Sequence, residues 1–315
     1  MPDTTFTSKH RVETELGGRP FSIETGSIAK LASSAVLVSH GETTVLATVV
    51  RANPRPGLDF FPMQVDYRER TSAAGKFPGG FRKREGAPNE KEILTMRMID
   101  RPIRPLFPEG FIDEVQIQCW VMSHDGENDA DVIAGTAASA ALALSDAPFD
   151  GPTATVRVAR IHTDDGIAHV VNPTVTQLDY SDLDLVLTGH KDGINMIEVG
   201  AAEVDEQGIL DAMEFGYEEI KSLLTIIDEL VSKCGQEKRL GDNVVTIPDD
   251  IMAHVTSVCE KDMTAARQIQ GKHDRGAKVA ELKKALLENH YALKEDTTPA
   301  VANESAKRRS HANEA

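Results

Sequence analysis

The chain has 315 residues, a formal net charge of -16 at pH 7, 40% hydrophobic residues and 27% charged residues, which is the composition of a globular protein with room for roughly two domains. No stretch approaches the about 18 consecutive apolar residues of a membrane-spanning helix, and the first residues lack the apolar core of a secretory signal. The three cysteines are odd in number and far apart, which favours reduced thiols over a disulfide framework or a zinc site. We therefore expect a cytoplasmic protein with no membrane partner.

The N-terminal part of the chain predicts β-structure. Residues 21–26 alternate between apolar and polar side chains, and residues 35–50 hold two β-branched runs around the tripeptide His-Gly-Glu, the pattern of a hairpin. A proline-containing loop is predicted at 51–59. Residues 60–70 then form a short strand that leads into a cationic segment.

Residues 68–84 hold six arginines and lysines against a single glutamate, although the chain as a whole is acidic. The densest part is GGFRKREG, in which two glycines precede Phe81 and three consecutive cations, Arg82, Lys83 and Arg84. Such a segment can be a solvated surface loop, or it can bind phosphate groups at one place on an acidic body. The composition leaves both interpretations open.

A helix is predicted to begin at Asn89, because Pro88 precedes it and Glu92 stands where it completes a capping box. The apolar side chains between residues 93 and 99 fall nearly all round the axis of this helix. That distribution is typical of a buried helix.

Three arginines of the same helix, Arg97, Arg101 and Arg104, project within one narrow arc if the helical turn persists to residue 104, although prolines at 102 and 105 oppose that extension. Buried arginines need anionic partners. The partners are either carboxylates of the chain or phosphate oxygens, whose geometry the guanidinium group matches. The candidate carboxylates are Asp66, Asp100 and Glu109.

The chain from residue 114 to residue 235 predicts strands and helices in the succession of an α+β fold. Strands are predicted at 114–123, 151–161, 166–171 and 183–201, the last with a turn at 191–193, and helices at 129–146 and 205–235. The first of these helices consists of small residues, which allow close packing against a sheet. Asp182 and Asp184 lie two apart on one strand, so they are either a surface pair or candidate Mg²⁺ ligands.

The character of the sequence changes after Gly235, the predicted C-cap of the long helix. A linker is followed by residues with helical periodicity only, and the last residues are small and polar, which predicts disorder. The predicted division of the chain is a core over 1–235 with parts at about 10–148 and 149–235, a helical domain with its linker over 236–295, and a disordered tail over 296–315.

The common nucleotide-binding and catalytic motifs, such as Gly-x4-Gly-Lys-Ser/Thr, His-Glu-x-x-His, Cys-x-x-Cys and Gly-x-Ser-x-Gly, do not occur in the sequence. The ten histidines do not cluster. Spacing alone therefore assigns no catalytic residue and no metal ligand.

Long segments resemble the first core of the bacterial polynucleotide phosphorylase family. The most specific is GKFPGGFRKREGAPNEKEILTMRMIDRPIRPLFPEGF, residues 75–111, and the match continues through residues 24–50, 130–152 and 172–201. The resemblance implies a ribonuclease PH-like core, a fold of the ribosomal protein S5 domain 2-like type, followed by a small all-α domain.

The resemblance also implies an activity: phosphorolytic 3′→5′ degradation of single-stranded RNA in mRNA turnover, with inorganic phosphate as co-substrate and nucleoside diphosphates as products. Members of the family form homotrimeric rings, in which the counterpart of the basic loop lines the pore entrance. On that basis Phe81, Arg82, Lys83 and Arg84 are expected to bind RNA by stacking and phosphate contacts. The three helix arginines named above are candidates for contacts with phosphate or the RNA backbone.

The family's second core, which carries the phosphate-binding serines, the catalytic aspartate and the Mg²⁺ ligands, is missing from this sequence, as are the KH and OB-fold domains. By the family's internal repeat, the serine-rich turn corresponds to residues 131–135, DVIAG, and the essential Asp and Lys correspond to Leu178 and Val186. These side chains supply neither oxygen ligands nor cations. We therefore expect the chain to be inactive alone. It is either the N-terminal part of a polyribonucleotide nucleotidyltransferase, completed by a separately encoded second core, or an RNA-binding or assembly module without chemistry.

Overall fold

The computed structural model describes residues 8–55, 60–164, 166–241, 244–293 and 299–314. The chain divides into two compact units, a core unit over Met1–Val244 and a helical unit over Val245–Ala315. None of the helices within the described ranges is long and apolar enough to cross a membrane.

A six-stranded sheet forms the N-terminal part of the core unit. Its strands lie in the order β1-β2-β3-β4-β6-β5, and all neighbours are antiparallel except β5 and β6. The strict alternation of buried and less buried residues along β4 and β6 shows why the period-two sequence pattern predicts these strands. The bounds are His10–Leu16 (β1), Arg19–Thr25 (β2), Ser34–His40 (β3), Thr43–Ala52 (β4), Met63–Arg68 (β5) and Glu114–Ser123 (β6).

A four-stranded antiparallel sheet follows, with the strand order β10-β9-β7-β8. Its strands are β7 (Ala154–Thr163), β8 (Gly166–Val171), β9 (Ser181–His190) and β10 (Gly193–Ala201). The predicted strand at 183–201 is therefore the hairpin of β9 and β10, with its turn at the predicted place.

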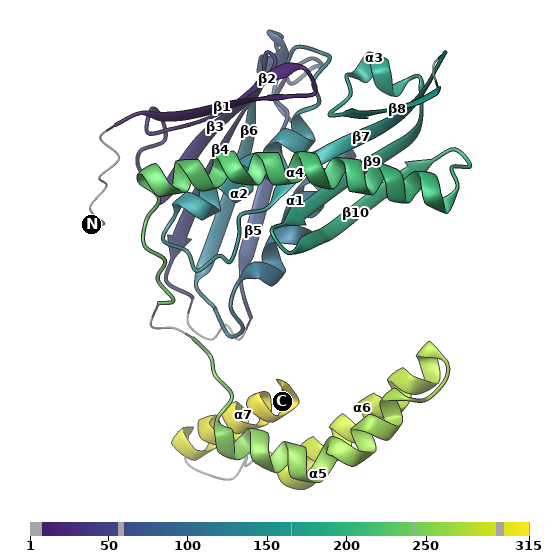
Figure 1. The fold of residues 1–315 in the computed structure, drawn as a ribbon. Helices are drawn as coiled ribbons and strands as arrows, with labels where there is room; N and C mark the ends of the chain where they lie inside the picture. Colours follow the sequence, from purple (N-terminus) through teal and green to yellow (C-terminus); the bar gives the residue numbers. More distant parts are fainter. Residues whose placement is uncertain (1–7, 56–59, 165, 242–243, 294–298, 315) are drawn as a thin grey trace. The chain divides into compact units, whose positions relative to one another are not determined.

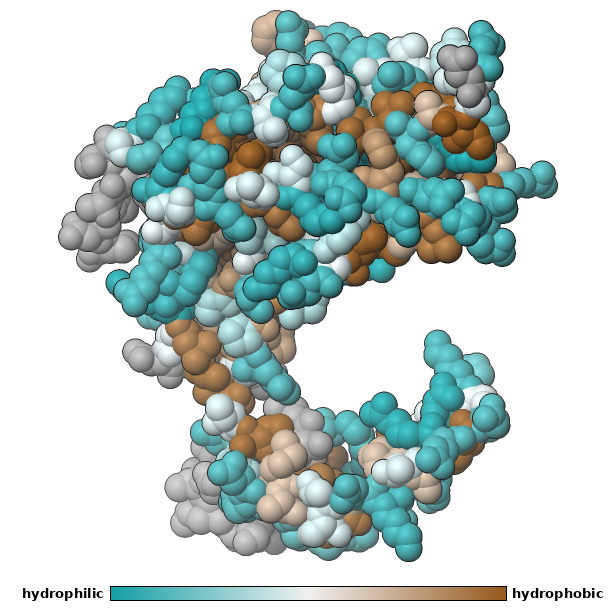
Figure 2. Space-filling model, in the orientation of Figure 1, coloured by the Kyte–Doolittle hydropathy of each residue, from teal (hydrophilic) through white to brown (hydrophobic). Residues whose placement is uncertain are grey.

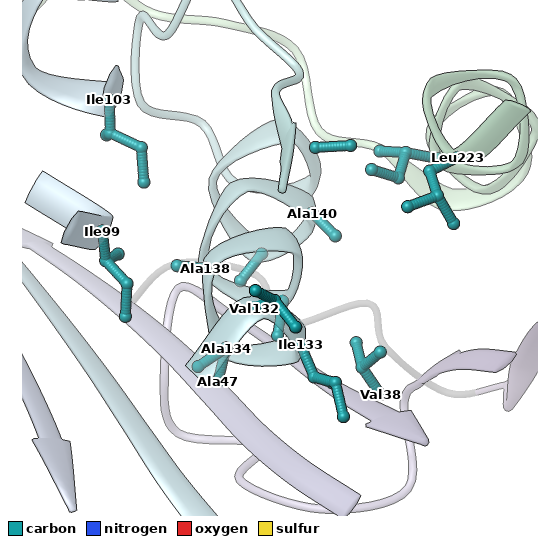
Figure 3. Close-up of a cluster of buried hydrophobic side chains, with 14 of the residues drawn as sticks. Val38, Ala47, Ile99, Ile103, Val132, Ile133, Ala134, Ala138, Ala140 and Leu223 are labelled. Atoms are coloured by element: carbon teal, nitrogen blue, oxygen red, sulfur yellow. The ribbon is translucent and has the colours of Figure 1, made fainter. Parts of the chain in front are cut away.

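Two helices join the sheets into one core. Every residue of α2 (Ala130–Leu144) is buried, because its small side chains let the helix pack closely between the large sheet and β7. Figure 3 shows Ala134 and Ala138 of α2 among side chains from the large sheet and from α1 (Glu90–Ile103). The long helix α4 (Glu206–Cys234) lies across the strands of both sheets (Figure 1). On the face of the core unit shown in Figure 2, hydrophilic side chains predominate, with hydrophobic side chains between them.

Short helical segments complete the core unit: the 3₁₀ turns η1 (Thr71–Ala74) and η2 (Arg104–Leu106), and α3 (Val175–Leu178). The mixed α+β architecture confirms the predicted fold class.

Helix α1 differs from its predicted environment. Its capping box is present: the Asn89 side chain accepts from the Glu92 amide, and Glu92 accepts from the Asn89 amide. However, Ile93 and Leu94 are about half exposed. The predicted burial on all sides is wrong, because the helix covers the core with only one face and exposes the other.

The core unit extends to Val244, beyond the predicted boundary at residue 235, because the segment after α4 binds the end of α2. The Lys238 Nζ donates to the carbonyls of Leu142, Ala143 and Ser145 at 2.8–2.9 Å, and the Gln236 amide donates to Leu144. The last carbonyls of a helix have no partner within the helix, so this lysine satisfies them.

The helical unit contains α5 (Asp249–Arg267), α6 (Lys272–His290) and α7 (Pro299–Glu314). Its apolar cluster is small, with Ile251, Val255, Leu286, Tyr291 and Ala312 buried. Helix α7 occupies most of the segment that composition predicts to be disordered. Its Arg309 donates to carbonyls of Leu287 and Tyr291 at the end of α6, a long-range contact that composition does not reveal. Residues 296–298 and 315 of the predicted tail lie outside the described residues.

Candidate nucleic-acid interface

The GGFRKREG segment, residues 79–86 and hereafter the basic loop, projects from the core unit. The Phe81 side chain is fully exposed, and the three cations that follow it are exposed. Among the described residues, none of Arg82, Lys83 and Arg84 has an ion-pair or hydrogen-bond partner. Gly80 and Lys83 both adopt positive φ, at 76° and 47°. The first of these conformations is one that glycine adopts at no steric cost.

The two ends of the loop region are held together at its base. The Glu92 carboxylate of α1 accepts from the Glu69 amide at 2.8 Å and from the Asn89 amide at 2.7 Å. The Arg68 Nη2 donates to the Gly86 carbonyl at 2.8 Å. Glu92 is buried, so the joint between β5 and α1 is part of the folded core rather than a surface contact.

The three arginines predicted to share an arc do not form one site. Arg97 and Arg101 lie on the exposed face of α1, and Arg101 pairs with Glu198 of β10 at 2.6 Å. Arg104 follows the last residue of α1, where it binds Asp100 at 2.6 Å and the carbonyls of Phe61 and Met63. Asp100, one of the three candidate carboxylates, is therefore the observed partner of Arg104.

A cleft of about 740 Å³ lies between α1 and the strands β9 and β10. Arg97 and Arg101 line it, whereas Arg104 does not. Val186, at the position where the family resemblance places an essential lysine, also lines the cleft and is 6% exposed. Leu178 lies in α3 and is not among the lining residues.

The floor of the cleft is a network of ion pairs centred on Arg157 of β7. Its guanidinium group binds Asp129 at 2.8 Å, Asp131 at 2.9 Å and Asp184 at 3.0 Å. Lys91 binds Asp129 from the other side at 2.9 Å. Burial disfavours the ionised forms of Asp129 and Arg157. Nevertheless, Arg157 and Lys91 lower the pKa of Asp129, and the three carboxylates raise the pKa of Arg157.

This network determines the chemistry that the cleft offers. The N-terminus of α2 could attract an external anion, but Asp131 in its first turn already occupies that position and is neutralised by Arg157. The segment DVIAG, residues 131–135, holds no hydroxyl side chain that could bind phosphate.

The candidate Mg²⁺ pair does not fit a metal. Asp184 is held by Arg157, and Asp182 is bound by both Arg160 and His162. Within the residues that the structure describes, no group of three or more histidine, cysteine or carboxylate side chains is arranged to hold a metal ion. The carboxylates on β9 therefore act as partners of basic side chains from β7.

Comparison with known proteins identifies the core unit. A family model described as the 3′ exoribonuclease family, domain 1, matches residues 17–148, and the model for domain 2 of the same family matches residues 151–219. The chain belongs to the 3′ exoribonuclease family. The cleft of this family member lies at the junction of the two domains, because domain 1 contributes Lys91, Asp129 and Asp131 and domain 2 contributes Arg157 and Asp184.

Relatives within this exoribonuclease family are much longer than the chain. It is 43% identical over 285 residues to the polyribonucleotide nucleotidyltransferase of Exiguobacterium sibiricum, covering 90% of the chain and 38% of that protein. The protein of the same name from Lysinibacillus sphaericus is 46% identical over 276 residues, covering 88% of the chain and 38% of that protein. The one from Bacillus cereus is 45% identical over 282 residues, covering 90% of the chain and 39% of that protein. The chain thus spans about two fifths of the length of these curated relatives.

A solved structure shares the fold. The crystal structure of rice Rrp46 has a TM-score of 0.54 to this chain at 15% sequence identity, covering 68% of the chain and 95% of the rice protein. At that identity the similarity concerns the fold alone.

The Arg157 network is the part of this site that sequence reasoning does not find. Its members come from α1, α2, β7 and β9, and no local spacing connects them. The only signal is that Arg157 is the single charged residue between positions 153 and 159, the buried first part of β7.

Proposed function

We propose that this chain binds single-stranded RNA through the basic loop and is the RNA-guiding, non-catalytic part of a phosphorolytic 3′→5′ exoribonuclease. The observation that carries this proposal is the contrast between the two groups of cations. Arg157 and Lys91 in the cleft are paired with carboxylates, whereas the cations of the basic loop are exposed and unpaired in the described structure. Unpaired cations beside an exposed aromatic ring are what a single strand requires, phosphate contacts together with a stacking surface.

The names of the relatives and the family resemblance support the rest of the proposal. In the complete enzyme, inorganic phosphate is the co-substrate, nucleoside diphosphates are the products and Mg²⁺ is bound by a second core. A homotrimeric, cytoplasmic ring places three basic loops around one entrance, which concentrates their charge on an acidic protein. The process served is mRNA turnover.

The basic loop is tested by the double substitution Arg82→Ala with Arg84→Ala. We expect weaker binding to single-stranded RNA and a salt dependence whose log–log slope is less steep by about 1.4, or about 0.7 for each lost phosphate contact. The melting temperature should stay nearly unchanged, because both side chains are exposed and unpaired among the described residues. Fluorescence anisotropy with a labelled oligonucleotide at several salt concentrations measures the RNA affinity and its salt dependence.

A matched control removes the same charge elsewhere. Arg11 and Arg55 are exposed and pair with Glu13 and Glu114, so their double replacement by alanine lowers the net charge equally without touching the loop. RNA affinity of the loop variant equal to that of the control at the same salt would show that the basic loop is only a solvated charge cluster.

The absence of chemistry in this chain is tested separately. We expect the purified chain to release no ADP from poly(A) in the presence of phosphate and Mg²⁺, because the carboxylates of the cleft are ion-paired and Val186 stands where the family resemblance places an essential lysine. Thin-layer chromatography of the products measures this, and phosphate-dependent release of ADP by the chain alone would contradict it.

The alternative is an RNA-binding or assembly module that serves no phosphorolysis at all. The same tight pairing of the cleft favours this possibility, because it leaves the chain without a chemical centre. Addition of a separately produced second core from one of the relatives distinguishes the two functions. Restored ADP release that depends on Arg82 and Arg84 supports the exoribonuclease, whereas RNA binding without restored phosphorolysis supports the module.

A further inference from the structure

Glu85 directly follows the three cations of the basic loop, yet its carboxylate points to a different partner. Its Oε1 accepts from the Thr71 amide at 3.0 Å and from the Thr71 hydroxyl at 2.7 Å. Both donors lower the pKa of the Glu85 carboxyl, so the carboxylate is ionised at neutral pH. The bonds close a loop from residue 72 to residue 84, which contains Phe81 and the three cations.

Thr71 is a fixed point for this closure. It is the first residue of η1, whose Ala73 carbonyl accepts from the His124 amide just beyond β6 at 3.0 Å. Its neighbour Arg70 stacks on Trp120 of β6, with 3.9 Å between the guanidinium carbon and the ring centre. The Glu85 bonds therefore attach the loop to the large sheet, independently of the buried Glu92 joint at its base.

We propose that Glu85 is a positioning residue for RNA binding: by tying the C-terminal end of the basic loop to Thr71, it holds Phe81 and the cations in the exposed arrangement that a single strand meets. This inference rests on the proposed function of the loop. A loop that is already closed loses less conformational freedom when RNA binds, so the protein binds RNA more tightly.

The sign of the effect separates this role from simple electrostatics. Glu85 carries a negative charge beside a phosphate-binding segment. If it acted only through its charge, its removal would strengthen RNA binding. If it acts as a tether, its replacement by alanine weakens RNA binding although a repulsive charge has been lost.

The experiment compares three variants of the full chain. We expect Glu85→Ala to bind a single-stranded oligonucleotide about fivefold more weakly than the parent at the same salt, because the loop must now be ordered on binding. Glu85→Gln keeps an oxygen acceptor for Thr71 and loses the charge, so its affinity should equal or exceed that of the parent. Glu109→Ala removes an exposed carboxylate that has no partner among the described residues and serves as the charge control.

Limited trypsin digestion provides a readout that does not depend on RNA. Cleavage after Arg82, Lys83 or Arg84 should be faster in Glu85→Ala than in the parent or in Glu85→Gln, while the melting temperature is unchanged. Equal or tighter RNA binding by Glu85→Ala, or an unchanged cleavage rate, would overturn the inference. Failure of the proposed function looks different, because then the Arg82 and Arg84 variant also binds RNA as well as the parent.

Discussion

At the scale of single residues, Arg157 pairs with the carboxylates of the cleft and so determines which charges are available there. A largely buried guanidinium group is tolerable in this position because it pairs with three carboxylates from two elements. The same ion pairs occupy the guanidinium group that a phosphate would need and the carboxylates that a metal ion would need as ligands. The residue thus stabilises the junction of the two family domains and removes ligands from the cleft at the same time.

Replacement of Arg157 by alanine should lower the free energy of unfolding of the core unit by about 3–5 kcal/mol, because three carboxylates lose a buried partner. Urea denaturation followed by the fluorescence of Trp120, the single tryptophan, reports on this unit. Arg55→Ala, which breaks an exposed pair with Glu114, is the control and should change stability by less than about 1 kcal/mol. Equal effects of the two substitutions would show that the network contributes no more than a surface ion pair.

At the scale of elements, the small residues of α2 decide how closely the two sheets approach. Gly135 is the clearest case, because a Cβ atom there would lie 2.6 Å from the Thr155 hydroxyl and 3.0 Å from the Thr155 Cβ in β7. No side chain fits without a shift of the helix or the strand. The sequence pattern predicts close packing of this helix, and the distance to β7 gives the physical reason.

Two glycine-to-alanine substitutions in helices should have opposite signs. Gly135→Ala should destabilise the core unit by about 1–3 kcal/mol through overpacking. Gly276→Ala in α6 meets nothing within 4 Å and should stabilise the helical unit by about 0.4–1 kcal/mol, because alanine loses less backbone freedom on folding. Amide hydrogen exchange measured by mass spectrometry follows each unit separately. A stabilising Gly135→Ala would mean that α2 and β7 are packed less tightly than the structure shows.

At the scale of the whole molecule, the connection between the units is short. The segment from Gln236 to Arg239 belongs to the core unit, since its Lys238 caps α2 and the Arg239 carbonyl accepts from Arg51 at 2.7 Å. The stretch that remains between the core unit and α5 is residues 245–248.

Limited digestion with proteinase K should therefore cut first within residues 245–248, and mass spectrometry of the fragments identifies the site. By contrast, trypsin should cut slowly after Lys238 and Arg239, because the backbone and side chains around them are hydrogen-bonded to the end of α2. Early cleavage at 236–241 would contradict the assignment of this segment to the core unit. Early cleavage inside α1 would contradict the joint at Glu92.

The sequence by itself determined the local features of this protein. The strands at 114–123 and 183–201, the capping box at Asn89 and the small-residue helix at 129–146 follow from periodicity and capping preferences, which act between residues close in the chain. The position of the basic loop follows from its composition in the same way. Its role in RNA binding stays a prediction.

Only the tertiary structure decided which charged residues are available. Arg97, Arg101 and Arg104 look equivalent on a helical projection, but the first faces the cleft, the second binds β10 and the third binds the end of its own helix. Arg157 and Lys238 find partners that are distant in sequence. Pairing of this kind depends on desolvation and on contacts between separate elements, and neither leaves a periodic signal in the sequence.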